Sequence, residues 1–182
     1  MIRFIGLGFA LAATAVAPPA AAQAPPSSVS AADPEGMARV LRYAGYPAEL
    51  ITDDYGDPEI ETEFAGWGGS IMFYGCDEDT HQGCDSIELR VGFDREEPMT
   101  LDLLNEVSSS RYIAAFLDKD GDPWINWDII TGNGEGIPAP VFLQSVNEFA
   151  SGVEYAADLV FAEESEKSVD LDDPSQRPDE TI

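Results

Sequence analysis

The sequence predicts an α+β fold in which an antiparallel sheet of about five strands packs against helices on one face. Three observations lead to this prediction. Several short runs alternate apolar and polar residues with period two, which is typical of half-buried strands. The turns between these runs are short, which favours antiparallel pairing. Three other segments carry apolar residues at helical spacing, and the resulting order is α-β-β-β-α-β-β-α.

The first helix is expected to begin at Asp33, a good N-cap residue. Pro34 suits the first helical position and Glu35 the first turn. Apolar residues from Met37 to Ala44 keep the helical spacing, and Gly45 ends the helix.

The strands of the first half follow this helix. Residues 48–51 are a candidate short strand, and residues 59–64 alternate glutamate with Ile60, Thr62 and Phe64, which predicts a strand with one acidic face. Residues 70–76 and 84–93 then flank a polar loop, and the second of these runs alternates strictly. Together they predict a hairpin.

This hairpin holds the two cysteines of the chain, Cys76 and Cys84. The ends of paired strands lie close together, so the two thiols are expected within bonding range. In an exported chain such a pair is a disulfide. A redox-active pair is the alternative, but seven residues separate the cysteines and the acidic loop would raise their thiol pKa values.

The second half continues with two helices and two strands. Pro98 and Thr100 open a helix, and residues 113–117 form a strand. Asp120-Gly121 is a hairpin-turn dipeptide, and residues 124–129 form the next strand. A glycine loop at 132–136 leads to the last helix, whose apolar stripe contains Phe142, Val146, Phe149, Val153, Ala156 and Val160.

This pattern resembles the YbjN-domain family over residues 33–162. The resemblance rests on the element order, on the run Leu41-Arg42-Tyr43-Ala44-Gly45-Tyr46, on Asp120-Gly121-Asp122 before an aromatic strand, and on the glycine loop before the last helix. It implies a fold similar to type III secretion chaperones, a non-enzymatic binding or regulatory role, and dimerisation as an open option. The resemblance identifies no catalytic residue in this chain.

The chain divides into four segments. Residues 1–22 read as a signal peptide, with Arg3 before an apolar stretch and small residues up to a cleavage site after Ala22. Residues 23–32 are a Pro/Ala/Ser linker, residues 33–162 one domain, and residues 163–182 a disordered acidic tail. A periplasmic location follows, and no later stretch reaches the roughly 20 apolar residues of a membrane span.

The net charge of −26 comes from 35 acidic residues against nine basic ones. Such a charge repels nucleic acid and anionic membranes and favours cations or basic partners. We therefore expect an unidentified protein partner and no nucleic acid.

One face of the sheet is a candidate protein-binding surface. If the apolar strand residues face the helices, the other face carries Met72, Tyr74, Glu88, Arg90, Trp124, Asn126 and Asp128. Ordinary cross-strand pairs on a solvated face are the alternative.

No catalytic, metal or cofactor site is predicted. Asp118 to Asp122 lacks the glycine and glutamate positions of an EF-hand, so a hairpin turn is favoured. His81 and its acidic neighbours are a polar loop by default. The alternative function is an envelope enzyme, or a binder of small cations or calcium, that acts through carboxylates.

Overall fold

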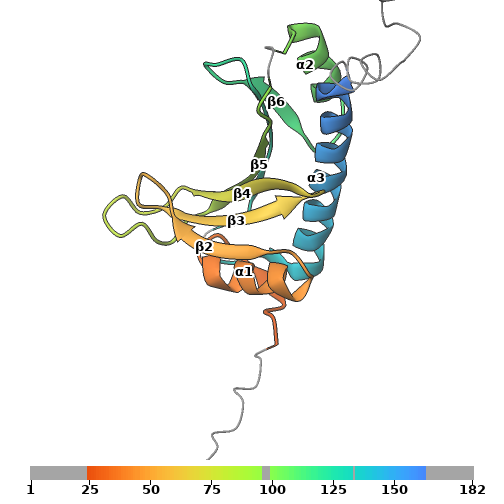
Figure 1. Cartoon of the computed structure of the whole chain (residues 1–182). Coiled ribbons are helices and arrows are strands. Elements are labelled where there is room, and N and C mark those ends of the chain that lie inside the picture. The colour runs from red at the N-terminus through yellow and green to blue at the C-terminus, as the bar shows by residue number, and fades with distance from the viewer. Residues whose placement is uncertain (1–23, 96–98, 133, 163–182) are drawn as a thin grey trace, which may run out of the picture.

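The computed structural model describes residues 24–95, 99–132 and 134–162. The expected signal peptide and acidic tail therefore lie outside the described residues. The α+β prediction is confirmed, because helices and an antiparallel sheet make up the described chain (Figure 1).

The main sheet has six strands in the described residues, in the order β2-β3-β4-β5-β7-β6, and every neighbouring pair is antiparallel. The strands are β2 (Ala48–Thr52), β3 (Pro58–Phe64), β4 (Trp67–Tyr74), β5 (Ser86–Gly92), β6 (Ala114–Leu117) and β7 (Pro123–Ile130). The expected count of about five was low by one, because the candidate short strand is a full edge strand that pairs with β3 over its whole length. As an edge strand it has no fully buried residue, so its alternation is weak.

Three helices lie on one side of this sheet: α1 (Pro34–Tyr43), α2 (Leu101–Ser108) and α3 (Ala139–Val160). The expected N-cap is present, since Asp33 accepts a hydrogen bond from the Gly36 N–H at 2.9 Å. Thr100, which was expected to open a helix, caps α2 by accepting a hydrogen bond from the Leu103 N–H at 3.3 Å. Figure 1 shows α3 running along the face of the sheet from α1 at one end to α2 at the other. Within the described chain, none of the helices combines the length and hydropathy that a membrane span needs.

Part of the expected linker is structured. Residues Ser28–Val29 form β1, which pairs antiparallel with β8 (Ile137–Pro138). Val29 and Ala31 are buried, and the Ala31 N–H donates to the Thr131 hydroxyl at 2.9 Å. A pairing across more than 100 residues leaves no local signal in a Pro/Ala/Ser stretch, so composition alone could not predict it.

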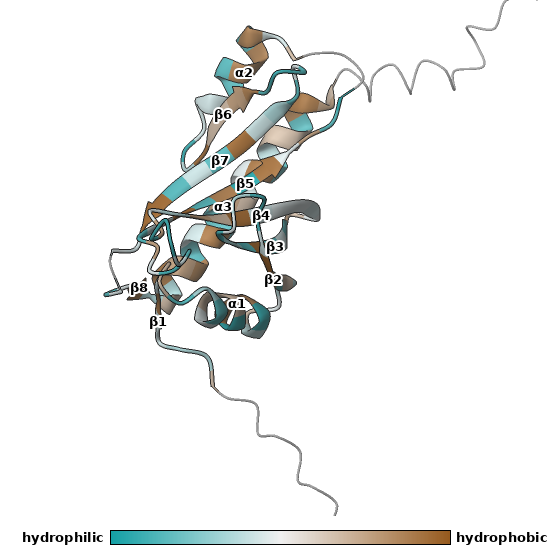
Figure 2. Cartoon of the chain, turned by 90° about the vertical axis from the view of Figure 1, so that its left-hand side faces the viewer, coloured by the Kyte–Doolittle hydropathy of each residue, from teal (hydrophilic) through white to brown (hydrophobic). Residues whose placement is uncertain are grey.

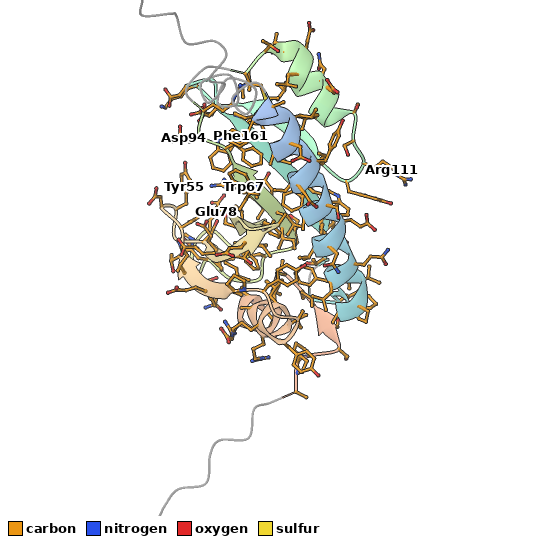
Figure 3. All side chains as sticks on the ribbon, turned by 45° about the vertical axis from the view of Figure 1, so that its right-hand side comes forward. Tyr55, Trp67, Glu78, Asp94, Arg111 and Phe161 are labelled. Atoms are coloured by element: carbon orange, nitrogen blue, oxygen red, sulfur yellow. A yellow bond between two sulfur atoms is a disulfide. The ribbon has the colours of Figure 1, made fainter. Side chains whose placement is uncertain are left out.

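The core lies between the sheet and α3. All six residues of the predicted stripe on α3 are buried, and Phe149 packs edge-on against Phe64 of β3 with ring centroids 4.8 Å apart. Burial of one such side chain contributes about 2 kcal/mol. The end of α3 is held by Phe161, which stacks on Trp67 at 5.3 Å, and Figure 3 shows the two side by side. One face of the sheet is thus fully used for packing, and the other is left uncovered by helices.

Candidate functional site: an acidic trough on the open sheet face

We call the side of the main sheet opposite the helices the open face. Figure 2 looks toward it, with β5 and β7 in front of α3 and with hydrophilic and hydrophobic residues alternating along β7. Cross-strand pairs place the predicted residues here in rows: Met72 with Glu88 and Asp128, Arg90 with Asn126, and Trp124 beside Gly92. These residues therefore lie on the face of the sheet opposite the helices, as the alternation of the strands predicted.

The predicted residues are not equally accessible. Tyr74 is 44% exposed, whereas Met72 is only 8% exposed and contributes to the floor of the face. Arg90, Trp124 and Asn126 are half-buried. Only part of the predicted surface is thus available for contact.

A hollow of about 840 Å³ occupies the centre of the open face, and we call it the trough. Its floor is made of small residues on the central strands, Gly68 and Ser70 on β4 and Gly92 on β5. The strong twist of the sheet, seen in Figure 1 as the change of strand direction between β4 and β5, makes this face concave. Seven carboxylates line the trough: Glu49, Glu59, Glu61, Glu63, Asp94, Asp118 and Asp122.

Arg90 is the one basic side chain that lines the trough among the described residues. Its guanidinium lies over the Trp124 ring, 4.9 Å from the ring centroid, in a cation–π contact. Trp124 is itself oriented by a hydrogen bond, because its indole N–H donates to Asp118 Oδ2 at 3.4 Å. The trough therefore has an arginine–tryptophan pair at its centre and carboxylates around it.

Asp118 begins the β6–β7 turn, and its carboxylate is held by backbone groups. Oδ1 accepts the N–H groups of Asp120 at 2.9 Å and Asp122 at 3.0 Å. The bond from Asp122 is the main cause that lowers the pKa of Asp118, because hydrogen bonds to the charged form favour it. This is the predicted hairpin turn, and in the described part of the chain no three His, Cys, Asp or Glu side chains come together in a group that could hold a metal ion.

A second cluster lies on the open face beyond the trough. Asn126 donates to Glu88 at 2.9 Å, and the Tyr74 hydroxyl donates to the same carboxylate at 3.5 Å. Burial raises the pKa of Tyr74, and the nearby negative charge of Glu88 raises it further. Tyr74 does not line the trough, so the predicted surface divides into two parts.

The disulfide between Cys76 and Cys84 is present and closes the β4–β5 loop. Within this loop, His81 Nδ1 lies 2.8 Å from Asp57 Oδ1, in the β2–β3 turn. The imidazole also covers Gly56, where an added Cβ would lie 2.9 Å from His81 Cε1. Figure 3 shows Tyr55 and Glu78, one from each loop, on the same side of the molecule. The histidine thus joins two hairpin loops, a role that the sequence did not predict.

Most trough carboxylates were not predicted as site residues. The alternating glutamates of β3 were recognised as an acidic face, and this signal locates one wall. The opposite wall comes from Asp94, in the loop after β5, and from Asp118 and Asp122, in the β6–β7 turn. Only the fold brings these loops together.

Comparison with known families places most of the described domain in a known family. Residues 33–160, more than half of the chain, match the model of the YbjN family, described as "Putative bacterial sensory transduction regulator". No curated protein matches the chain.

Proposed function

The chain belongs to the YbjN family, and we propose that it is an exported, non-enzymatic regulatory module that binds a basic segment of a partner protein in the trough. The observation that carries the proposal is the charge of the trough, where seven carboxylates surround one arginine. A basic segment is complementary to this surface, and such complementarity speeds association and selects the partner.

The chain's own acidic segment does not suit the trough. Residues 163–182 carry eight carboxylates against Lys167 and Arg177, so like-charge repulsion opposes their binding. A basic segment of another protein has the required charge. The half-buried Trp124 would supply the aromatic contact that often dominates the energy of such interfaces.

The composition of the trough favours binding over catalysis. Small-molecule sites are mostly apolar with a few polar groups, whereas seven of the seventeen residues that line the trough are carboxylates. An acid–base carboxylate that works near neutral pH needs a raised pKa. The pKa of Asp118 is instead lowered by backbone hydrogen bonds, so it is suited to holding a negative charge for electrostatic attraction.

Gly68 offers a way to test the trough with little damage to the fold. A Cβ at Gly68 meets no atom within 4 Å, so Gly68→Leu would fill the hollow without a clash at the backbone. We expect this variant to weaken binding of a fluorescent lysine-rich peptide at least about tenfold, while Gly68→Ala has a smaller effect. Equal affinities for wild type and Gly68→Leu, with matched melting curves, would contradict the proposal.

The same titration separates a protein segment from a small cation. Spermine competing with the peptide at micromolar concentration would identify the trough as a polyamine site and replace the proposed partner. The exported location, supported by the N-terminal pattern and the disulfide, has its own test. Protein recovered from the periplasmic fraction should have the mass expected for cleavage after Ala22.

A further inference from the structure

Arg90 has a half-buried guanidinium with no polar partner. Its Nε is buried without a hydrogen bond, and the side chain makes neither an ion pair nor a hydrogen bond in the described part of the chain. The guanidinium lies over the Trp124 ring, 4.9 Å from the ring centroid. The guanidinium is therefore held in position by stacking, while its terminal nitrogens remain available at the trough surface.

Arg90 shares this lack of a partner with Arg39 and Arg95, whose buried Nε atoms also make no hydrogen bond in the described chain, but among the described residues only Arg90 lines the trough. Arg42 and Lys119 both form ion pairs, with Glu35 and Asp120. Arg90 does not, because its direct cross-strand neighbours are Ser70 and Asn126.

The nearest acidic residue on β5 is engaged elsewhere. Glu88 accepts hydrogen bonds from Asn126 and Tyr74, so both of its oxygens already have partners. Glu61 is on β3, two strands away from Arg90, which corresponds to roughly 10 Å across the sheet. The fold thus keeps the guanidinium unpaired within an acidic trough.

We propose that Arg90 binds an acidic side chain of the partner segment, and that basic residues of the same segment flank this side chain. The inference rests on the proposed function of the trough. An arginine can bind a carboxylate through two parallel N–H···O bonds, which are among the stronger hydrogen bonds in proteins. The partner would then carry a basic–acidic–basic pattern instead of an unbroken basic run.

The carboxylates on both sides of Arg90 determine this pattern. Glu61 and Glu63 lie on one side across β4, and Asp118 and Asp122 lie on the other side near Trp124. An internal acidic residue places cations on both sides, whereas a C-terminal carboxylate would leave one side without a partner. An extended chain advances about 3.3 Å per residue, so lysines two positions away on each side can reach the walls with their long side chains.

Two peptides test the inference. The Glu peptide consists of repeats of Lys-Ser-Glu-Ser-Lys. The Gln peptide has Gln in place of each Glu, which removes the negative charge and keeps nearly the same side-chain shape. We expect wild type to bind the Glu peptide about tenfold more tightly than the Gln peptide, although the Gln peptide is more basic. Arg90→Met should abolish this preference and should bind the Gln peptide more tightly than wild type does, because a repulsive cation has been removed.

Two further variants separate the role of the planar guanidinium from a general effect of positive charge. Arg90→Lys keeps the charge but loses the planar fork, so it should retain only part of the preference. Arg111→Met removes one positive charge far from the trough. Figure 3 shows Arg111 on the opposite side of α3 from Asp94, which lines the trough, so this variant should bind like wild type.

Failure of this inference can be distinguished from failure of the proposed function. If wild type binds both peptides through the trough but prefers the Gln peptide or neither, the role of Arg90 is overturned and the proposed function stands. If neither peptide binds, both are overturned. Should Arg90→Met unfold, the comparison of wild type with Arg90→Lys still decides the matter.

Discussion

The indole of Trp124 lies directly over Gly92, so that a Cβ added to Gly92 would be 2.8 Å from Trp124 Cζ2. The glycine therefore provides the space in which the aromatic ring lies against the sheet. The ring in turn supports the guanidinium of Arg90 and donates to Asp118. A residue without a side chain thus positions the centre of the trough.

The first prediction concerns this glycine. Gly92→Ala should displace the Trp124 ring, because real Cβ atoms essentially never approach a heavy atom within 3.0 Å. We expect a changed tryptophan emission spectrum and a loss of the Glu-peptide preference, with little change in overall stability. Gly68→Ala, at an open position of the same trough, should leave the emission spectrum unchanged. An identical response of the two variants would show that the ring does not depend on Gly92.

The second prediction concerns the disulfide. Reduction of Cys76–Cys84 should lower the free energy of unfolding by about 2–3 kcal/mol, because it releases the loop constraint in the unfolded chain. The measurement is urea denaturation with and without reductant. Cys76→Ala with Cys84→Ala should cost more than reduction alone, since Cys84 is fully buried and its truncation also leaves a cavity. A double variant as stable as the oxidised protein would contradict this account.

Local patterns predicted those parts of the fold that depend on neighbouring residues. Asp33 caps α1 and Thr100 opens α2 as expected, and the stripe on α3 is buried along its length. The strict alternation of β5 places Leu89 toward the core and Arg90 on the open face. These features depend on spacing along one segment, which a sequence displays directly.

The remaining features depend on residues that are distant in the sequence. The bond between His81 and Asp57 joins two loops that meet because β3 pairs with β4. The trough requires the twist of the sheet and the convergence of two loops, the one after β5 and the β6–β7 turn. The pairing of β1 with β8 is likewise non-local. No periodicity encodes such contacts, so sequence reasoning found the open face but missed its concavity.

The third prediction is a pH dependence of stability. Backbone hydrogen bonds lower the pKa of Asp118 in the folded state relative to about 3.9 in an unfolded chain. Ionised Asp118 therefore stabilises the fold above the unfolded pKa, and this contribution is lost as the pH falls through the lower folded pKa. Asp118→Asn keeps an acceptor oxygen but not the charge. It should melt at a lower temperature than wild type at neutral pH, and the difference should vanish in acid.

A matched control separates this effect from general charge repulsion. Asp54→Asn removes the same charge from an exposed turn position whose carboxylate makes no hydrogen bond in the described chain. Its melting temperature should equal or exceed that of wild type, because the protein is strongly acidic. A parallel response of both variants to pH would mean that the hydrogen bonds to Asp118 do not matter.

The last prediction distinguishes the two parts of the open face. Trp124 lines the trough and supports Arg90, whereas Tyr74 lies outside the trough and contacts Glu88. Trp124→Ala should therefore weaken binding of the Lys-Ser-Glu-Ser-Lys peptide about tenfold or more, because it removes both an aromatic contact and the support of the guanidinium. Tyr74→Ala should change the affinity less than about twofold. Isothermal titration calorimetry on both variants, at matched thermal stability, measures the two effects. Equal losses would mean that the bound segment extends over the whole open face, since a residue outside the trough would then contribute as much as one at its centre.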